Sequence, residues 1–458
     1  MSAVLQEAPE AAEAGSGLVP SAGAQSPRAL AKPAAGALRP EVIDSGERLE
    51  KLRGDWAALN LSARAGCLFL GPEWQLPWWK HFGAGRELCV VALREGPRLV
   101  GLLPFFRERV RLGGISARRL AFLGDGAAGC DYLDVLAAPG REDEVQAEAL
   151  RALLALDWDA CELDGMLRES ATALALVQRF PPGRPTAFAE QGGAVRREAQ
   201  LRFVCPYIPL GGSYDEYLAT FGRRENLRRR EKWLARQPGF EIACARTPEE
   251  AAPALEAFFR LHRARWAAEG GSDGLAGERF EEFHRHAVAE LARAGMLRLY
   301  TLSCARRPVA SVYGVVQRNR FLYYQSGYDP LWASRSVGLV LLARTVKDAF
   351  AEGLEEFDFL RGNEAYKAQW KRAERWTIRL QLFRGRRGLL GRAALRTAGL
   401  LRSAVKAALP GGALSAARVA RRLLRAPPPE GEGRWSAALK VFAAARDDGP
   451  GAGDNQRM

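Results

Sequence analysis

The sequence is poor in residues that bind metals or build disulfide frameworks. It has four histidines and seven cysteines in 458 residues, and no two cysteines form a C-x-x-C pair. The cysteines stand singly, most of them within apolar runs, at Cys67, Cys89, Cys130, Cys161, Cys205, Cys244 and Cys304. An odd, unpatterned set argues against a disulfide framework or a zinc knuckle. The sequence therefore predicts buried, free cysteines, no metal site and a cytoplasmic location.

Long apolar runs are absent as well. No stretch of eighteen or more apolar residues occurs, so a transmembrane helix is not expected. Residues 1–40 are rich in Ala, Gly, Pro and Ser and have no apolar core behind a basic start, which predicts a disordered leader and not a secretory signal. With 48% apolar residues and enough length for two or three domains, the remainder is expected to be globular.

Positive charge is concentrated near the C-terminus. The formal net charge is +14, and residues 384–425 hold eleven Lys and Arg with no acid. Subtracting these eleven leaves +3 for the rest, which does not favour nucleic-acid binding. We predict a basic amphipathic helical segment over 386–426 and a flexible tail over 427–458. Three interpretations of the basic segment stay open: contact with an anionic membrane, packing on the protein body, or a flexible tail.

Two parts of the chain share one rhythm of elements. Residues 87–106 are expected to form a hairpin around "EGPR", followed by a helix near 140–155 and the strand "WDACELDG". Residues 296–316 are expected to form a second hairpin around "ARRP", followed by the strand "RFLYYQSG", a helix near 336–352 and the strand "EEFDFLRG". The halves are either diverged copies or a chance repeat of a common unit.

Helix start signals occur ahead of the second hairpin. Ser213 with Glu216, and Thr247 with Glu250, have capping-box spacing. The first pair predicts a helix over about 213–236 that becomes strongly basic in "RRENLRRREKW".

A further helix is expected over about 277–294, where apolar residues recur on one face. His284 and His286 flank that face. We expect them to be surface or half-buried histidines and not ligands.

The second part thus reads helix, helix, three strands, helix, strand, helix, strand. Three hairpin-linked strands followed by strand–helix–strand crossovers predict an α/β (α+β) fold with a mixed, mostly antiparallel sheet flanked by helices. This order resembles the core of the GNAT acyltransferases.

The runs "FLYYQSGYDP", "SRSVGLVLL" and "EEFDFLRGNEAYKAQW" resemble the CelD/BcsL-like group of GNAT-superfamily acetyltransferases, bacterial proteins often linked to cellulose or exopolysaccharide synthesis. The resemblance covers roughly residues 45–385 and includes "FFRLHRARW" and "LAFLGDGAAGCDYLDVL". It also extends to the two-lobe FemAB family, which implies tandem GNAT-like lobes at 41–200 and 201–385. The family often has an acid directly after "LRG", where this chain has Asn363.

The resemblance implies acetyl-CoA, or another acyl-CoA, as co-substrate. A helix starting after "SRS" would present free backbone N–H groups to a pyrophosphate. The candidate cofactor residues are Arg335, Ser336, Val337, Gly338 and Leu339. The alternative is that Ser336 is an ordinary N-cap.

Three residues are candidates for the chemistry of transfer. The GNAT layout implies that Tyr366 protonates the coenzyme thiolate, unless its ring is only packed against the sheet. Asp358 is either the general base or the anchor of Arg361, because an acid in so apolar a strand needs a partner. Lys367 is the third candidate, and with Arg361 it can hold an anionic acceptor or phosphate.

The acceptor cleft is predicted from the same corner and one preceding helix. Its candidate residues are Arg361, Asn363, Glu364, His262 and Trp266.

The sequence therefore predicts an acyltransferase that moves an acyl group from acyl-CoA to an amine or hydroxyl of a sugar or other cell-envelope precursor. Direct attack needs no covalent enzyme intermediate. The location would be cytoplasmic, with peripheral contact at the inner membrane through 386–426. Two alternatives stay open: a FemAB-like aminoacyltransferase that uses aminoacyl-tRNA, and a non-catalytic basic adaptor on a GNAT scaffold. The oligomeric state is not predicted.

Overall fold

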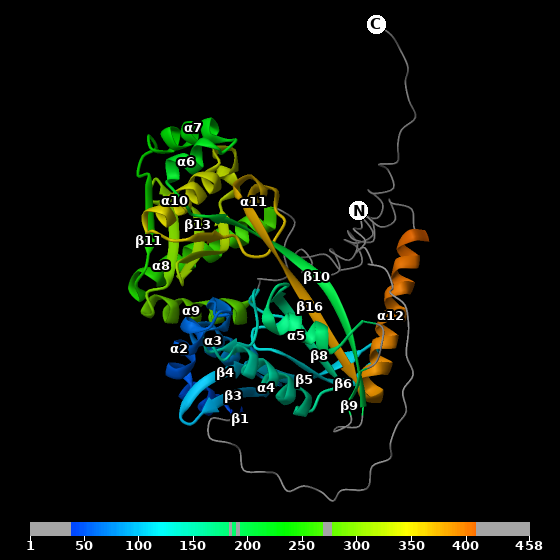
Figure 1. Cartoon of the computed structure of the whole chain (residues 1–458). Helices are drawn as coiled ribbons and strands as arrows, with labels where there is room; N and C mark the ends of the chain where they lie inside the picture. Colours follow the sequence, from blue (N-terminus) through cyan, green and yellow to red (C-terminus); the bar gives the residue numbers. More distant parts are fainter. Residues whose placement is uncertain (1–37, 183–185, 189–192, 269–276, 409–458) are drawn as a thin grey trace, which may run out of the picture. The chain divides into compact units, whose positions relative to one another are not determined.

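The structure of the chain is a computed structural model that describes residues 38–182, 186–188, 193–268 and 277–408 (Figure 1). The predicted leader covers residues 1–40, of which residues 1–37 lie outside the described residues, as does the predicted tail over 427–458. The end of the leader is predicted too far along the chain, because Arg39 and Pro40 already belong to strand β1 (Arg39–Ile43).

Most strands join one twelve-stranded sheet. In spatial order its strands are β11 (Glu241–Ala245), β12 (Leu297–Cys304), β13 (Arg307–Gln317), β14 (Arg320–Tyr328), β15 (Glu356–Asp358), β10 (Gly193–Pro209), β16 (Ala373–Arg384), β8 (Ala160–Leu167), β6 (Ile115–Phe122), β5 (Phe105–Leu112) and β2 (Glu87–Leu88), with β9 (Thr186–Phe188) paired to β10. A second sheet has the order β1 (Arg39–Ile43), β3 (Val90–Glu95), β4 (Arg98–Leu103) and β7 (Leu136–Ala137).

Helices precede, connect and follow these strands. They are α1 (Gly46–Lys51), α2 (Arg53–Ser62), η1 (Leu68–Leu70), α3 (Pro72–Phe82), α4 (Glu142–Ala155), α5 (Ala171–Arg179), α6 (Tyr214–Ala219), α7 (Arg224–Leu234), α8 (Pro248–Ala268), α9 (Glu278–Arg293), η2 (Pro330–Arg335), α10 (Val337–Ala351), α11 (Ala365–Trp370) and α12 (Gly385–Ala408).

The two ends of the large sheet have the same topology, and they exchange strands. Each end contains a parallel pair that is linked through a helix: β6 and β8 through α4, and β14 and β15 through α10. Strand β10 follows β8 in the chain but pairs with β15, whereas β16 follows β15 but pairs with β8. Strands β10 and β16 pair with each other along the centre (Figure 1). Each lobe is thus completed by a strand from the other half of the chain.

The predicted fold class is confirmed. Both sheets are flanked by helices, and among the described strands the only parallel pairs are β6–β8 and β14–β15. Both predicted hairpins form: β3–β4 turns at "EGPR", and β12–β13 turns at Ala305 and Arg306, whose φ angles of 48° and 61° suit a tight hairpin turn. The predicted lobe boundaries stay a prediction, and the boundary between 200 and 201 falls inside β10.

The core has two parts that cover opposite faces of the second half of the sheet. One part contains α8 and α9 and continues into the first half of the chain, where Trp74 of α3 meets Phe283 of α9 edge to face at 5.1 Å. The other part contains α6, α7 and α10. Five of the seven cysteines are buried, as predicted for small apolar side chains.

Two expectations about helices are wrong. The predicted helix 213–236 is broken into α6 and α7 after Ala219, although its Ser213–Glu216 capping box is present. His284 is fully buried, because α9 packs its face against α3 and the sheet. Its Nε2 lies 3.3 Å from the Tyr324 hydroxyl, and burial lowers the pKa of His284 to about 3.

The basic segment at the C-terminus begins as α12, which packs against β5, β6, β10 and β16. Arg392 and Arg396 of this helix bind Glu198 of β10 at 2.7 and 2.8 Å. The described part of the basic segment therefore packs on the protein body, which is one of the three interpretations left open from the sequence. Residues 409–426 lie outside the described residues.

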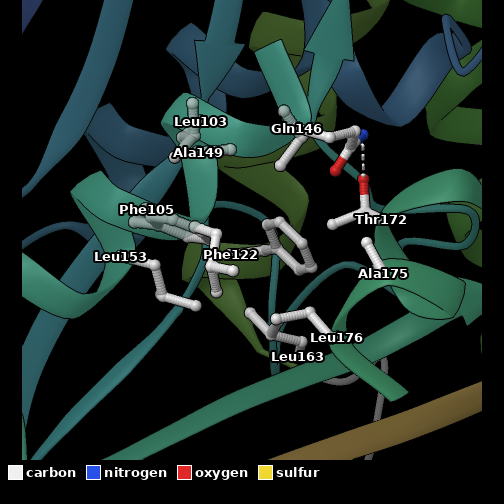
Figure 2. A pocket seen from close by; sticks show the side chains of 12 residues that line it. Leu103, Phe105, Phe122, Gln146, Ala149, Leu153, Leu163, Thr172, Ala175 and Leu176 are labelled. Atoms are coloured by element: carbon white, nitrogen blue, oxygen red, sulfur yellow. Dashed lines mark hydrogen bonds between the residues drawn. The ribbon is translucent and has the colours of Figure 1, made fainter. Parts of the chain in front are cut away.

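The first lobe contains a small apolar cavity between its sheets and α4 and α5 (Figure 2). Its volume is about 20 Å³, and its lining includes Phe105, Phe122 and Leu163. The Gln146 side-chain amide donates a 2.9 Å hydrogen bond to Thr172 at its rim. A single water needs about 15 Å³. The cavity therefore has room for one water at most and is too small to be a ligand site.

Candidate active site

The parallel strands β14 and β15 pair over only three residues and then part. The register runs from Arg320 opposite Glu356 to Leu322 opposite Asp358, where β15 ends. Strand β14 continues to Tyr328, and α10 begins nine residues later in the chain, at Val337. The separation leaves a wedge between the end of β14 and the chain that follows β15.

The first turn of α10 has no side-chain cap. Ser336 adopts a left-handed conformation with φ 58°, and its hydroxyl does not bond the helix amides. The alternative of an ordinary Ser336 N-cap is therefore not observed. A Cβ atom on Gly338 would have Tyr328 as its nearest neighbour, at 4.0 Å. No side chain therefore caps the first turn, and Gly338 is exposed while Val337 is fully buried; anion binding at this terminus stays a prediction.

Arg335 lies beside this terminus. Its guanidinium carbon is 4.4 Å from the ring centre of Trp233 in α7, so the side chain is stacked on an aromatic platform. Arg335 is exposed, whereas Val337 is buried in the core beneath the sheet. The structure thus brings all five predicted cofactor residues to one helix terminus.

Asp358 is fully buried at the end of β15. Its carboxylate accepts hydrogen bonds from the Tyr132 hydroxyl at 2.9 and 3.1 Å and from the Leu360 amide at 2.7 Å. Burial raises the pKa of Asp358 to about 6, although the positive charge of Arg375 opposes the shift. Leu360 itself has φ 55°, a conformation that costs a non-glycine residue free energy and that the Asp358 bond stabilises.

Arg361 pairs with Asp131, not with Asp358. The Asp131 carboxylate accepts from the Arg361 side chain at 2.6 Å and from its backbone amide at 3.0 Å, and the Cys130 carbonyl accepts a further bond. The hypothesis that Asp358 anchors Arg361 is therefore wrong, because Asp131 from the first lobe occupies that position. Asp131 is 230 residues away in the chain, so no local spacing indicates the pair.

Lys367 closes the turn between β15 and α11. Its ammonium donates to the Arg361 carbonyl at 2.7 Å and lies 3.1 Å from the Glu364 carboxylate. Lys367 is buried, while Asn363 and Glu364 are exposed. Gly362 has φ 138°, a backbone conformation that other residues rarely adopt, so the turn needs glycine there. The catalytic role of Lys367 stays a prediction, and the geometry gives it a structural one.

Tyr366 of α11 lies at the wedge with its hydroxyl hydrogen-bonded to Tyr323 of β14. Burial raises the pKa of Tyr366 well above 10. The phenol therefore keeps its proton at neutral pH, as a proton donor must.

His262 and Trp266 lie one turn apart on α8. The Trp266 indole N–H donates to His262 Nε2 at 2.7 Å, and burial, with Arg265 and Arg263 adding to it, lowers the pKa of His262 to about 4. The backbone of α8 at His262 approaches β14 at Gly327 so closely that a Cβ there would be 2.4 Å from the His262 nitrogen. The predicted acceptor residues on α8 therefore lie against β14, on the wedge.

Arg265 was missed as a site residue from the sequence, although it belongs to the quoted run "FFRLHRARW". Its guanidinium lies over the rings of Trp266 and Tyr328 at 5.4 and 5.5 Å, and donates to Ser326 at 3.1 Å. Arg265 thus adds a positive charge at the side of the wedge where α8 packs on the end of β14.

The loop 123–135 of the first lobe was also missed as part of the site. The Tyr324 hydroxyl donates to the Ala128 carbonyl at 2.8 Å, in addition to the bonds of Asp131 and Tyr132 with the corner after β15. Tyr132 and Ala128 have φ angles of 61° and 58°, so the loop is held in strained conformations by these contacts. The run "LAFLGDGAAGCDYLDVL" thus supplies one wall of the candidate active site.

No group of three or more Cys, His, Asp and Glu side chains arranged to hold a metal occurs within the described ranges. Likewise, none of the helices that the structure describes combines the length and hydropathy of a membrane-spanning segment.

Comparison with known proteins gives one family match and several distant structural similarities. Residues 222–368, from α7 to α11, match the family described as the acetyltransferase (GNAT) domain. No curated protein gives a significant match.

Among solved structures, FemX is 11% identical, with a TM-score of 0.48, over 74% of this chain and 96% of its own. The L-PGS of Bacillus licheniformis is 13% identical, with a TM-score of 0.40, over 61% and 80%. A tandem GNAT protein from the clavulanic acid biosynthesis pathway is 13% identical, with a TM-score of 0.36, over 75% and 98%.

Proposed function

We propose that this protein transfers an acyl group from acyl-CoA to an amine or hydroxyl of an acceptor by direct attack. The observation that carries the proposal is the wedge between β14 and β15, at which α10 presents an uncapped N-terminus. The match of residues 222–368 to a GNAT acetyltransferase domain supports the same chemistry.

The donor would lie with its pyrophosphate on the first turn of α10. The N–H groups of Val337, Gly338 and Leu339 and the positive end of the helix dipole favour an anion there. Arg335, held on Trp233, can pair with a second phosphate of the coenzyme. Bound acyl-CoA would supply the activated thioester carbonyl.

Tyr366 would protonate the coenzyme thiolate as the acyl group leaves, and the proton released by the attacking amine or hydroxyl would return to the Tyr366 phenolate through solvent. Its raised pKa keeps the hydroxyl protonated, and Tyr323 orients it. Asp358 is assigned as a positioning residue, because its carboxylate is fully buried and holds Leu360 and Tyr132. The hydrogen bonds of Asp358 fix the strained corner that carries Arg361 and α11.

The acceptor class that we propose is a sugar or another precursor of the cell envelope, in line with the resemblance to CelD/BcsL-like proteins. Arg361, Asn363, Glu364, His262 and Trp266 are its proposed contacts. We further propose a cytoplasmic site of action, with peripheral contact at the inner membrane through the basic segment that starts in α12.

The donor half of the proposal is tested by thermal unfolding with acetyl-CoA and with longer acyl-CoAs. Binding to the native state must raise the midpoint progressively once the ligand concentration exceeds Kd, and the gain in stability reaches about 2.7 kcal/mol at one hundred times Kd. Desulfo-CoA serves as the control for binding without a thioester. Absence of a shift with every acyl-CoA would remove the proposed activity.

A second candidate function is transfer from aminoacyl-tRNA. The observation in its favour is the exposed basic face of α7, where Arg228, Arg229, Lys232 and Arg236 surround Trp233. Such a face suits a nucleic-acid backbone. Titration with tRNA at two salt concentrations, together with thermal unfolding in acetyl-CoA, separates the two candidates. Transfer from aminoacyl-tRNA predicts tRNA binding that weakens steeply with salt, and no stabilisation by acetyl-CoA.

A further inference from the structure

The first lobe holds a polar cavity of about 330 Å³ next to the candidate active site. Its charged lining comes from four strands, one loop and the corner after β15, and consists of Arg119, Asp125, Glu162, Asp164, Arg202, Arg361 and Arg379. The remaining wall is mostly glycine from the loop after β6. The cavity is far larger than a single water requires and falls in the size range of ligand sites, about 300–1,000 Å³.

The cavity lies on the face of the sheet opposite to α4 and α5. Side chains alternate along β8, so Leu163 points into the apolar core whereas Glu162 and Asp164 point into the cavity. This face carries charged groups that would be costly to bury without partners. An apolar core does not explain them.

Each guanidinium in the cavity has a carboxylate partner. Arg119 binds Asp125 at 2.7 Å, Arg379 binds Asp164 at 2.6 Å, and Arg202 binds Asp164 at 3.1 Å. Although burial opposes it, the hydrogen bonds from Arg379 and Arg202 lower the pKa of Asp164, so its carboxylate stays charged. Arg361 completes the set through Asp131 at 2.6 Å.

This pairing decides which ligand fits. A phosphate would have to compete with carboxylates that already neutralise the arginines, and a cation would meet guanidinium groups. A neutral polyhydroxylated molecule has neither conflict, because each hydroxyl can donate to a carboxylate oxygen and accept from a guanidinium. Gly126 and Gly129 line the loop side of the cavity, where an added Cβ atom would have no neighbour within 4 Å.

The cavity is linked to the corner after β15 through Arg361 and through the loop after β6. The Arg361 guanidinium lines the cavity, while its carbonyl accepts from Lys367 and its amide donates to Asp131. The loop that forms the glycine wall also provides Tyr132 to Asp358. A molecule in the cavity would therefore contact Arg361, which is one of the residues proposed for the acceptor.

We propose that this cavity binds an uncharged saccharide, and that it is the subsite for the acceptor. The second part rests on the proposed acyltransferase function, and the first part does not. The ligand class is a neutral sugar unit, and not a sugar phosphate or the nucleotide part of an activated sugar.

The test is saturation-transfer NMR on the full chain without acyl-CoA, using cellobiose and chitobiose as neutral probes and glucose 1-phosphate and inorganic phosphate as anionic probes. We expect millimolar binding of at least one neutral disaccharide and no competition from phosphate. Glu162→Gln removes one charge from the lining, so the neutral sugar should bind about tenfold more weakly and phosphate should begin to bind.

Glu198→Gln is the matched control. Glu198 binds Arg392 at 2.7 Å and Arg396 at 2.8 Å and is half-buried like Glu162, but neither Glu198 nor its two arginine partners line the cavity. Sugar binding should be unchanged in this variant. If Glu162→Gln does not fold, Gly129→Asn replaces it: φ 56° suits asparagine, nothing lies within 4 Å of a Cβ there, and the side chain would occlude the cavity.

The results separate this inference from the proposed function. Saccharide binding without any acetyl-CoA stabilisation would keep the cavity assignment and remove the acyltransferase. Acetyl-CoA stabilisation with no binding of either neutral probe would overturn the inference, as would phosphate competition in the unmodified chain or an equal loss in Glu198→Gln.

Discussion

The uncapped first turn of α10 gives a sharp prediction through Gly338→Asp. Gly338 is the second residue of the helix and is exposed, and a Cβ atom there would touch nothing closer than the Tyr328 ring at 4.0 Å. An acid in a first helical turn stabilises the helix by about 0.3–1 kcal/mol. The substitution should therefore leave the thermal midpoint unchanged or raise it.

The same charge must weaken acyl-CoA binding if the pyrophosphate lies on this turn. A carboxylate about 5 Å from a phosphate charge, at an effective dielectric constant of about 20, costs about 3 kcal/mol. Salt at physiological strength screens roughly half of that over this distance. The expected result is binding weaker by about tenfold to thirtyfold.

Isothermal titration with acetyl-CoA measures this loss, and Gly338→Asn is the neutral control of the same size. Desulfo-CoA should lose affinity by the same factor, because the effect acts on the phosphates and not on the thioester. Equal affinities for the Asp and Asn variants, with both folded, would refute the placement of the pyrophosphate at α10.

Three further predictions concern the corner after β15. Tyr366→Phe should lower kcat by about 10²-fold or more with little change in acetyl-CoA affinity, measured as release of CoA thiol with an acceptor that supports turnover; an unchanged kcat would remove the proton-donor role. Asp358 has a pKa of about 6 in the folded state against about 3.8 unfolded, so its ionisation lowers stability as pH rises through that window. In urea unfolding, the stability of Asp358→Asn relative to the unmodified chain should thus increase between pH 4 and pH 7, by up to about 3 kcal/mol, and a flat difference would contradict the raised pKa. Asp131→Asn leaves Arg361 without its carboxylate and should cost about 2 kcal/mol of unfolding free energy; since the Arg361 side chain is a third exposed, a loss near zero would mean that water replaces the partner.

Local patterns in the sequence were sufficient for many, but not all, of the elements of the second lobe. The hairpin at "ARRP", the helix α9 and the capping boxes at Ser213 and Thr247 depend on residues within a few positions of one another. The break between α6 and α7 was missed because arginines continue the helical composition through Arg223. A composition that favours helix on both sides of a break contains no signal for the break itself.

The strand exchange and the contacts across the corner could not be predicted in this way. Tyr132 and Asp358 are 226 residues apart, and their hydrogen bond exists only because β10 and β16 place the lobes side by side in one sheet. The buried state of His284 has the same origin, since α3 of the first lobe covers it. Periodicity identifies the face of a helix that is apolar, but not the distant element that packs on it.

The match to a GNAT domain covers only part of the candidate site. The matched residues, 222–368, contain α10, β15 and Tyr366, which form the proposed donor side. They exclude β10 and β16, which flank β15 and continue the sheet into the first lobe. They also exclude the loop with Asp131 and Tyr132, whose side chains hold Arg361 and Asp358 in place. The domain therefore carries the proposed coenzyme chemistry, whereas the geometry of the corner and the proposed saccharide cavity depend on the first lobe. Differences in acceptor between proteins with the same donor domain are accordingly expected to arise from the loop 123–135 and the strands that face it.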